Sequence, residues 1–291
     1  YSKMLNVNKI VIGTAQFGKN YGLSNTSGEI NNKSAQNILK ICSNRGIKFL
    51  DTAASYGASE IKLGQLNLDN FNIITKISKD DFFGTDWVSH NTAKSLNRLK
   101  RKNIYCAMFH DANDLFDDIS CFKQMISLKE NNVIQKIGIS VYNPLVYRKI
   151  KSLGVKIDLI QVPFNIFDQR LLSTGVGEEL KKDGVEVHAR SLFLQGLLLM
   201  SSKKRPSKFN RWNLNFDALQ NWAYSMDISL LQACLCFALK YDFIDRLVLG
   251  IDNEKHLRQI LACDVSGILE FPDDLAVSSE LLINPYNWNR I

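Results

Sequence analysis

The chain has 291 residues, is 45% hydrophobic and carries a formal net charge of +7. This length suffices for one large hydrophobic core, and barrels of alternating strands and helices commonly reach it as a single domain. No apolar run approaches the roughly 18 residues of a membrane-spanning helix, and no arginine-rich tail or nucleic-acid-binding motif is present, so neither a membrane span nor a nucleic-acid partner is expected.

The first strand is predicted at residues 7–13, and it leads into a loop of mostly small residues at 14–18. A helix is predicted at 33–45, because apolar residues recur there on one face, and Gly46 is placed to end it. A second short apolar run follows at once and stops at Asp51. This segment therefore reads as one strand, helix, strand unit.

The same alternation repeats along the rest of the chain. Further strands are predicted at 71–76, 104–109, 134–139, 158–162, 185–189 and 246–250, and helices at 85–100, 115–130, 144–153, 178–182 and 230–240. Eight strands alternating with helices, without a long Pro/Gly/Ser linker, favour an α/β fold of the closed (β/α)8 TIM-barrel type, a single domain over 1–291. The missing GxGxxG fingerprint counts against a Rossmann domain.

Cysteine usage bears on metal binding and on the compartment. The six cysteines are scattered, mostly within apolar runs, and none forms a pair at CxxC spacing. This pattern indicates no metal site and no disulfide framework. We therefore expect a reducing, cytoplasmic setting.

Polar residues stand at the predicted carboxyl ends of several strands, which meet at one mouth of a barrel. They are Asp51, Lys76, His110, Ser140, Gln161 and Ser191. Lys76 needs a counter-ion, and Asp51 on the neighbouring strand can provide it. A cation beside Tyr56 favours the ionised form of tyrosine, which makes Tyr56 a candidate proton donor.

Structural roles remain open for the same residues at this point. Asp51 equally fits a cap of the following helix, and Tyr56 fits a half-buried wedge in the loop. His110 is suited to hydrogen-bond an incoming carbonyl oxygen, or to be satisfied by a backbone carbonyl at the edge of the core.

The segments GTAQFG, FLDTAASYG, ITK, MFHD, GIS, DLIQVPFN and VLGID, in this order over nearly the whole chain, resemble the aldo-keto reductase superfamily. The resemblance implies a (β/α)8 barrel with a catalytic tetrad of Asp51, Tyr56, Lys76 and His110. It also implies hydride transfer from NADPH to the carbonyl carbon of a small-molecule substrate, with Tyr56 delivering the proton and His110 orienting the substrate. The run ARSLFLQGLLL is similar to family members encoded among bacterial surface-polysaccharide genes, which points to a keto-sugar.

The resemblance also implies residues that hold the coenzyme. Ser140 and Gln161 correspond to the pair that binds the nicotinamide carboxamide, although Val141 stands where the family often has Asn. Arg190 replaces an aromatic residue that stacks on the nicotinamide ring, and a guanidinium can also lie flat against a ring. The remaining coenzyme contacts are expected from Thr14, Ala15, Ser191, Gly250, Asn253 and His256.

The end of the site that binds adenosine departs furthest from the family pattern. Gly250, Ile251 and His256 stand where NADPH-selective members carry Lys, Ser and Arg. Lys255 and Arg258 lie close by in sequence. They either take the place of the missing Lys, Ser and Arg or form the solvated face of a helix. We therefore expect NADPH as the coenzyme with a small preference, so that NADH is also used.

Two further questions stay open at the level of sequence. The basic segment 203–211 fits a solvated loop or a lid over the coenzyme. The alternatives to a reductase are a coenzyme-binding sensor or scaffold of the same fold without turnover, and a barrel lyase or epimerase that acts on sugars. The physiological substrate and the oligomeric state are not encoded in any motif that we find.

Overall fold

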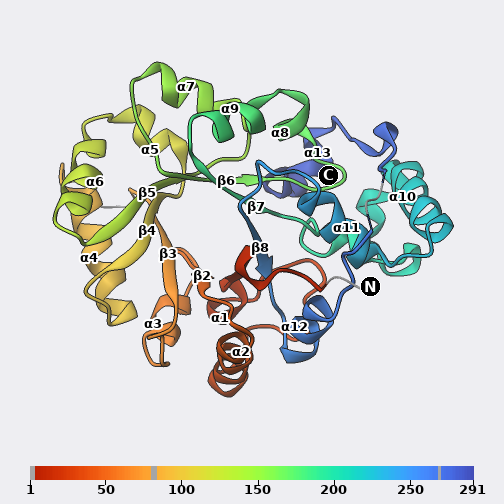
Figure 1. Cartoon of the computed structure of the whole chain (residues 1–291), viewed down its shortest axis with the longest axis horizontal. Coiled ribbons are helices and arrows are strands. Elements are labelled where there is room, and N and C mark those ends of the chain that lie inside the picture. The colour runs from red at the N-terminus through yellow and green to blue at the C-terminus, as the bar shows by residue number, and fades with distance from the viewer. Residues whose placement is uncertain (1–3, 80–83, 268–269) are drawn as a thin grey trace.

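The structure, a computed structural model, describes residues 4–79, 84–267 and 270–291 (Figure 1). Eight parallel strands pair in sequence order, and β1 closes on β8, which confirms the predicted (β/α)8 barrel. The strands are β1 (Ile10–Gly13), β2 (Phe49–Asp51), β3 (Asn72–Ile77), β4 (Ile104–Phe109), β5 (Ile134–Ser140), β6 (Leu159–Pro163), β7 (Glu186–Arg190) and β8 (Arg246–Gly250).

Helices surround the strands and are packed against their outer face (Figure 1). The α-helices are α1 (Ala15–Gly18), α2 (Asn32–Arg45), α3 (Ser59–Leu63), α4 (Trp87–Leu99), α5 (Ala112–Asp117), α6 (Cys121–Glu130), α7 (Val146–Ser152), α8 (Arg170–Ser173), α9 (Val176–Lys182), α10 (Asn213–Ser225), α11 (Leu230–Leu239), α12 (Glu254–Leu261) and α13 (Glu280–Ile283). The 3-10 turns are η1 (Val7–Lys9), η2 (Leu197–Leu199), η3 (Ser202–Lys204), η4 (Ser207–Trp212), η5 (Asp273–Leu275) and η6 (Pro285–Arg290).

Local chemistry explains how α2 leads into the second strand. The Asn31 side chain accepts a hydrogen bond from the Ser34 amide and so caps the first turn. Gly46 ends the helix at φ 78°, a left-handed conformation that glycine adopts without strain, and its N–H bonds to the last turn. The chain is thereby turned directly into β2, as predicted.

Three expected elements differ from the structure. The predicted loop at 14–18 contains the short helix α1, in which the Lys19 amide bonds to the Ala15 carbonyl. The first strand is shorter than predicted, because residues 7–9 form η1, which begins where the Asn6 side chain accepts from the Asn8 amide. The expected helix at 115–130 is two helices, α5 and α6. Asp118 separates them with an extended φ of −148°, and its carboxylate accepts from both the amide and the hydroxyl of Ser120.

The barrel interior follows the two-residue period of its strands. An apolar layer inside the barrel consists of Val11, Phe49, Ile74, Cys106, Met108 and Leu159. Alternate residues of a strand point the same way. The residues two positions further along β2, β3 and β6, which are Asp51, Lys76 and Gln161, therefore face the same interior at its carboxyl end, where they line a cavity.

A polar network occupies the opposite, amino-terminal end of the barrel. The Glu186 carboxylate accepts from Tyr105 Oη at 2.6 Å and Arg246 Nε at 3.0 Å, pairs with His188 Nε2 at 2.7 Å, and also contacts Lys136. Burial alone would raise the pKa of Glu186, but these partners outweigh it and hold that pKa far below its usual range. The network ties the first residues of β7 and β8 to β4 and β5.

None of the described helices is by itself long and apolar enough to cross a membrane. A bent pair formed by Ser207–Ser225 and Leu230–Leu239 meets the length and composition only when the two pieces are added together.

Candidate active site

A cavity of about 1250 Å³ opens at the carboxyl ends of the strands, bounded by the loops after β1, β2, β7 and β8. Its volume exceeds the roughly 300–1,000 Å³ of pockets for drug-sized ligands, so it has room for a dinucleotide beside a substrate. The predicted site residues that line it are Ala15, Asp51, Tyr56, Lys76, His110, Ser140, Gln161, Arg190, Ser191, Gly250, Asn253 and His256.

Thr14 is the predicted site residue that lies behind the cavity wall. Its side chain is fully buried, and its hydroxyl lies 2.9 Å from both the Asp51 carbonyl oxygen and the Ser59 hydroxyl. Thr14 thus joins β1 to the loop that follows β2.

Lys76 is the centre of the polar cluster inside the cavity. It is only 1% exposed, and its Nζ donates to Asp51 Oδ2 at 2.5 Å, to the Thr52 carbonyl at 3.1 Å and to Tyr56 Oη at 3.4 Å. Burial alone lowers the pKa of Lys76, but the Asp51 charge and Tyr56 outweigh it and raise that pKa above its usual value. The side chain is therefore an ammonium ion at neutral pH.

Asp51 has both carboxylate oxygens occupied. Oδ2 accepts from Lys76, and Oδ1 accepts from Gln161 Nε2 at 2.8 Å. The N-cap of α3 is Ala58, so Asp51 does not cap that helix. Gln161, expected to contact the coenzyme, thus has one amide hydrogen engaged with Asp51 and lines the cavity from β6.

Tyr56 is positioned by a close approach between two loops. The Ala58 amide donates to the Gly18 carbonyl at 3.2 Å, and a Cβ at Gly18 would lie 1.9 Å from the Tyr56 carbonyl oxygen. Only glycine fits there. The end of α1 therefore supports the loop that carries the candidate proton donor.

His110 follows β4 and faces Tyr56 edge-on, with ring centroids 5.9 Å apart. Its Nδ1 lies 3.2 Å from Ser55 Oγ. Burial, reinforced by the charges of Lys76, Arg190 and Lys19, lowers the pKa of His110 to about 3. The imidazole is therefore neutral across the physiological range.

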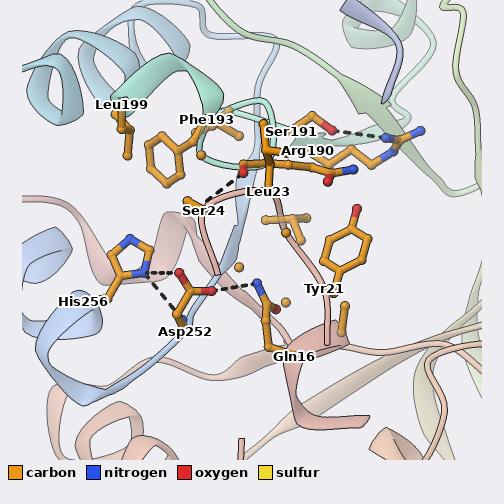
Figure 2. Close-up of a pocket in the computed structure, with 18 of the residues that line it drawn as sticks. Gln16, Tyr21, Leu23, Ser24, Arg190, Ser191, Phe193, Leu199, Asp252 and His256 are labelled. Carbon is orange, nitrogen blue, oxygen red and sulfur yellow. Dashed lines mark hydrogen bonds and ion pairs between the residues drawn. The ribbon is translucent and has the colours of Figure 1, made fainter. Parts of the chain in front are cut away.

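Arg190, at the end of β7, is held in place by two neighbours. One guanidinium nitrogen donates to the Val141 carbonyl at 3.0 Å and the other to Ser191 Oγ at 3.2 Å, and the group lies 4.7 Å from the centre of the Tyr142 ring. Its Nε is buried without a hydrogen-bond partner. Figure 2 shows Arg190 and Ser191 side by side along the cavity.

Three residues that line the cavity were not predicted from the sequence: Lys19, Tyr21 and Tyr142. Lys19 Nζ lies 5.1 Å from the centre of the Tyr56 ring and 5.6 Å from that of Tyr21. Burial lowers the pKa of Lys19, and burial followed by Tyr56 raises that of Tyr21 to about 12. No motif marks these residues, because they meet only through the fold.

The basic segment 203–211 has mixed roles. Arg205 is buried, stacks 3.7 Å from the Phe216 ring centre and donates to Asn213, while Lys208 donates to the Trp288 carbonyl. Among the five basic residues of the segment, Lys204 is the one that lines the cavity. Arg205 and Lys208 therefore contact the protein itself, whereas Lys203, Lys204 and Arg211 are exposed.

Two buried polar atoms of the cavity lining bear on which kind of ligand fits there. Gln16 Oε1 and Arg190 Nε are buried without a partner, and both side chains line the cavity. Buried polar groups are normally hydrogen-bonded, so such atoms suit a polar ligand. The cavity size, these atoms and the cations Lys76 and Arg190 together fit a nicotinamide dinucleotide.

The aldo/keto reductase family model matches residues 9–265. The chain belongs to the aldo/keto reductase family. The curated D-arabinose 1-dehydrogenase of Saccharomyces cerevisiae is 28% identical over 153 residues, which are 48% of this chain and 44% of that protein, so the match spans less than half of that relative's length. The holo form of an aldo-keto reductase from Bacillus halodurans aligns with a TM-score of 0.72 at 18% identity, covering 94% of each chain. At 18% identity, the solved structure supports the barrel fold of this aldo/keto reductase family member.

Proposed function

We propose that this aldo/keto reductase is an NAD(P)H-dependent carbonyl reductase that converts an aldehyde or a ketone, keto-sugars included, to an alcohol. The observation that carries the proposal is the buried Lys76 ammonium, which donates at once to Asp51 and to the Tyr56 hydroxyl. Tyr56, Lys76 and Asp51 thus form a row at the cavity wall. In this row Tyr56 is the proton donor, Lys76 the cation beside it and Asp51 the counter-ion of Lys76.

The row suits proton delivery to a carbonyl oxygen. When the Tyr56 hydroxyl gives up its proton, the phenolate oxygen already has the Lys76 ammonium beside it, and Asp51 keeps that ammonium in place. The Lys76 ammonium therefore stabilises the negative charge that develops on Tyr56 Oη, without any rearrangement of the site. Ser55 Oγ lies 3.2 Å from His110 Nδ1. In the tautomer that accepts from Ser55 at Nδ1, the proton of neutral His110 is on Nε2, where it can be donated to the same carbonyl oxygen.

A reduced nicotinamide coenzyme, when bound, supplies the hydride for the carbonyl carbon, so that carbonyl, hydride and proton give the alcohol and the oxidised coenzyme. Ser140, Gln161, Arg190 and Ser191 would hold it near Tyr56. The remaining contacts would come from Ala15, Gly250, Asn253 and His256.

A sugar is the substrate class that we favour. The cavity wall near Tyr56 is polar, with Lys19 and Ser55 close to the proposed proton donor. The yeast relative is named for its action on D-arabinose, although the match covers 44% of its length. Polar walls of this kind suit a hydroxylated carbonyl compound better than an aliphatic one.

The test is the Tyr56→Phe variant, which removes the donated proton and keeps the ring. We expect turnover with any accepted carbonyl to fall by about 10²–10⁴, the usual effect of losing a general acid, with coenzyme affinity within a few-fold. Tyr142→Phe, the same change at another cavity tyrosine, serves as the matched control and should keep most of the turnover. Near-parental turnover in Tyr56→Phe would refute the proposal.

A further inference from the structure

The region of the cavity lined by Gln16, Asp252 and His256 has a chemistry that points to one coenzyme. Gln16 lies in α1, directly after β1, and Asp252 and His256 follow β8 (Figure 2). Strands β2 and β8 pair on opposite sides of β1. Asp252 and His256 therefore lie on the other side of β1 from Asp51, which ends β2, and Gln16 follows β1 between them.

Asp252 faces the cavity without a cationic partner. Its own amide donates to His256 Nδ1 at 3.5 Å, so Nδ1 is the nitrogen without a proton. Oδ2 is 3.7 Å from that nitrogen, too far for a hydrogen bond. Burial lowers the pKa of His256, although Asp252 opposes the shift, so the ring is neutral at physiological pH.

No Lys or Arg in the described part of the chain forms an ion pair with Asp252. Lys255 also lines the cavity, but it is exposed, and solvent and salt screen a charge in that position. The net charge next to the carboxylate therefore stays negative.

Gln16 adds a second acceptor to the same region. Its Nε2 donates to Asp252 Oδ1 at 3.3 Å, the orientation that a carboxylate requires because it only accepts. Oε1 is consequently directed elsewhere, and it is buried without a partner in a residue that is 6% exposed. Gly250 leaves room for this amide, since a Cβ there would lie 2.9 Å from Gln16 Nε2.

Acceptors with a negative charge require a ligand that brings donors. The adenosine ribose of NADH has two hydroxyl donors, and in the unrelated Rossmann fold an acidic side chain accepts from the 2′-hydroxyl of NAD. The 2′-phosphate of NADPH brings only acceptors at neutral pH and close to two negative charges. It would face the Asp252 carboxylate in a partly buried site.

We propose that Gln16 and Asp252 bind the adenosine ribose diol, and that this protein prefers NADH to NADPH. The proposal rests on the proposed function, since it takes the reduced nicotinamide to lie beside Tyr56 at the other side of β1. It reverses the small NADPH preference that the resemblance implies, because the Asp252 carboxylate would repel a 2′-phosphate at this position.

The test measures coenzyme binding without turnover. Dissociation constants of NADH and NADPH are measured from the fluorescence of the reduced nicotinamide, at about pH 7.5, for the parent and for Asp252→Asn. We expect the parent to bind NADH at least about tenfold more tightly, the scale of a charge-assisted hydrogen bond gained and a like charge avoided. Asp252→Asn should reduce this ratio about tenfold, mainly through tighter NADPH binding.

Two further variants sharpen the result. Gln16→Met removes the unpartnered acceptor and should weaken NADH binding several-fold. Glu178→Gln removes the same charge as Asp252→Asn from an exposed position on α9, outside the cavity, and should leave the ratio unchanged.

The outcomes separate the two proposals. Parental binding of NADPH equal to or tighter than that of NADH would overturn the ribose assignment and leave the reductase proposal standing. A ratio that does not respond to Asp252→Asn would do the same. Failure of both nucleotides to bind would overturn the proposed function together with the inference.

Discussion

At the scale of single residues, Lys76 contacts both Asp51 and Tyr56, and its charge has a different effect on each of them. Asp51 depends on the Lys76 charge for stability, because an unpaired carboxylate that is 2% exposed is costly. In the proposed mechanism, Tyr56 depends on the same charge only when the phenol gives up its proton. The effects of removing Lys76 on stability and on turnover therefore have different causes and can be separated.

Lys76→Met should lower turnover by about 10²–10⁴ and destabilise the fold by about 3–5 kcal/mol, since it leaves Asp51 buried and unpaired. Adding Asp51→Asn should recover part of the stability and none of the turnover. Urea unfolding and steady-state oxidation of the coenzyme measure the two effects. A double variant that regained its turnover would contradict the role of the ammonium beside Tyr56.

His110 gives the fold a pH dependence of known sign. Its pKa is lowered to about 3 from 6.5, so below 6.5 the unfolded chain binds a proton that the folded chain does not. The free energy of unfolding therefore decreases as the pH falls from about 6.5 toward 3. Between about pH 8 and about pH 5 this decrease is up to about 2 kcal/mol. In His110→Asn this part of the pH dependence should disappear from urea unfolding curves, and an unchanged curve would contradict the assignment.

At the scale of elements, the site depends on loops that support one another across the barrel mouth. The α1 turn packs under the loop of Tyr56 through Gly18, and Ser24 of the following loop donates from its amide to the Gln195 carbonyl at 3.3 Å in the loop after β7. Tyr56, the proposed proton donor, is thus held by backbone contacts with residues that lie far from it in sequence.

Gly18→Ala should lower turnover by at least about tenfold, because its Cβ would meet the Tyr56 carbonyl oxygen at 1.9 Å and displace the loop. Gly154→Ala is the control: no atom lies within 4 Å of its added Cβ, but φ is +72°. That variant should lose about 1–2 kcal/mol of stability and keep its turnover. Equal turnover in both variants would argue against the support role of α1.

At the scale of the whole molecule, burial controls the chemistry of the six cysteines. All six are unpaired thiols, five of them buried, and burial raises the pKa of each. Thiolates are the reactive form, so the thiols of the folded protein should be inert.

Labelling with an aromatic disulfide reagent at about pH 8 should therefore modify at most one thiol of the native protein, the partly exposed Cys263. Cys263→Ser should abolish this reaction, and unfolding in guanidinium should expose the remaining thiols. Rapid modification of several thiols under native conditions would show that the barrel opens far more often than its packing indicates.

The sequence alone determined the barrel and the row of Asp51, Tyr56 and Lys76. The periods of strands and helices are local patterns, and the observed bounds of β4 and β8 match the predicted ones. The carboxyl ends of strands in a closed parallel barrel meet at one mouth whatever the loops do, and this places Asp51 and Lys76 together. The tertiary structure decided what the loops bring together. It placed Gln16 against Asp252 and Lys19 over Tyr56, and it buried Arg205 away from the cavity. Such contacts join segments distant in the chain, and no local pattern of residues specifies which side chains will meet.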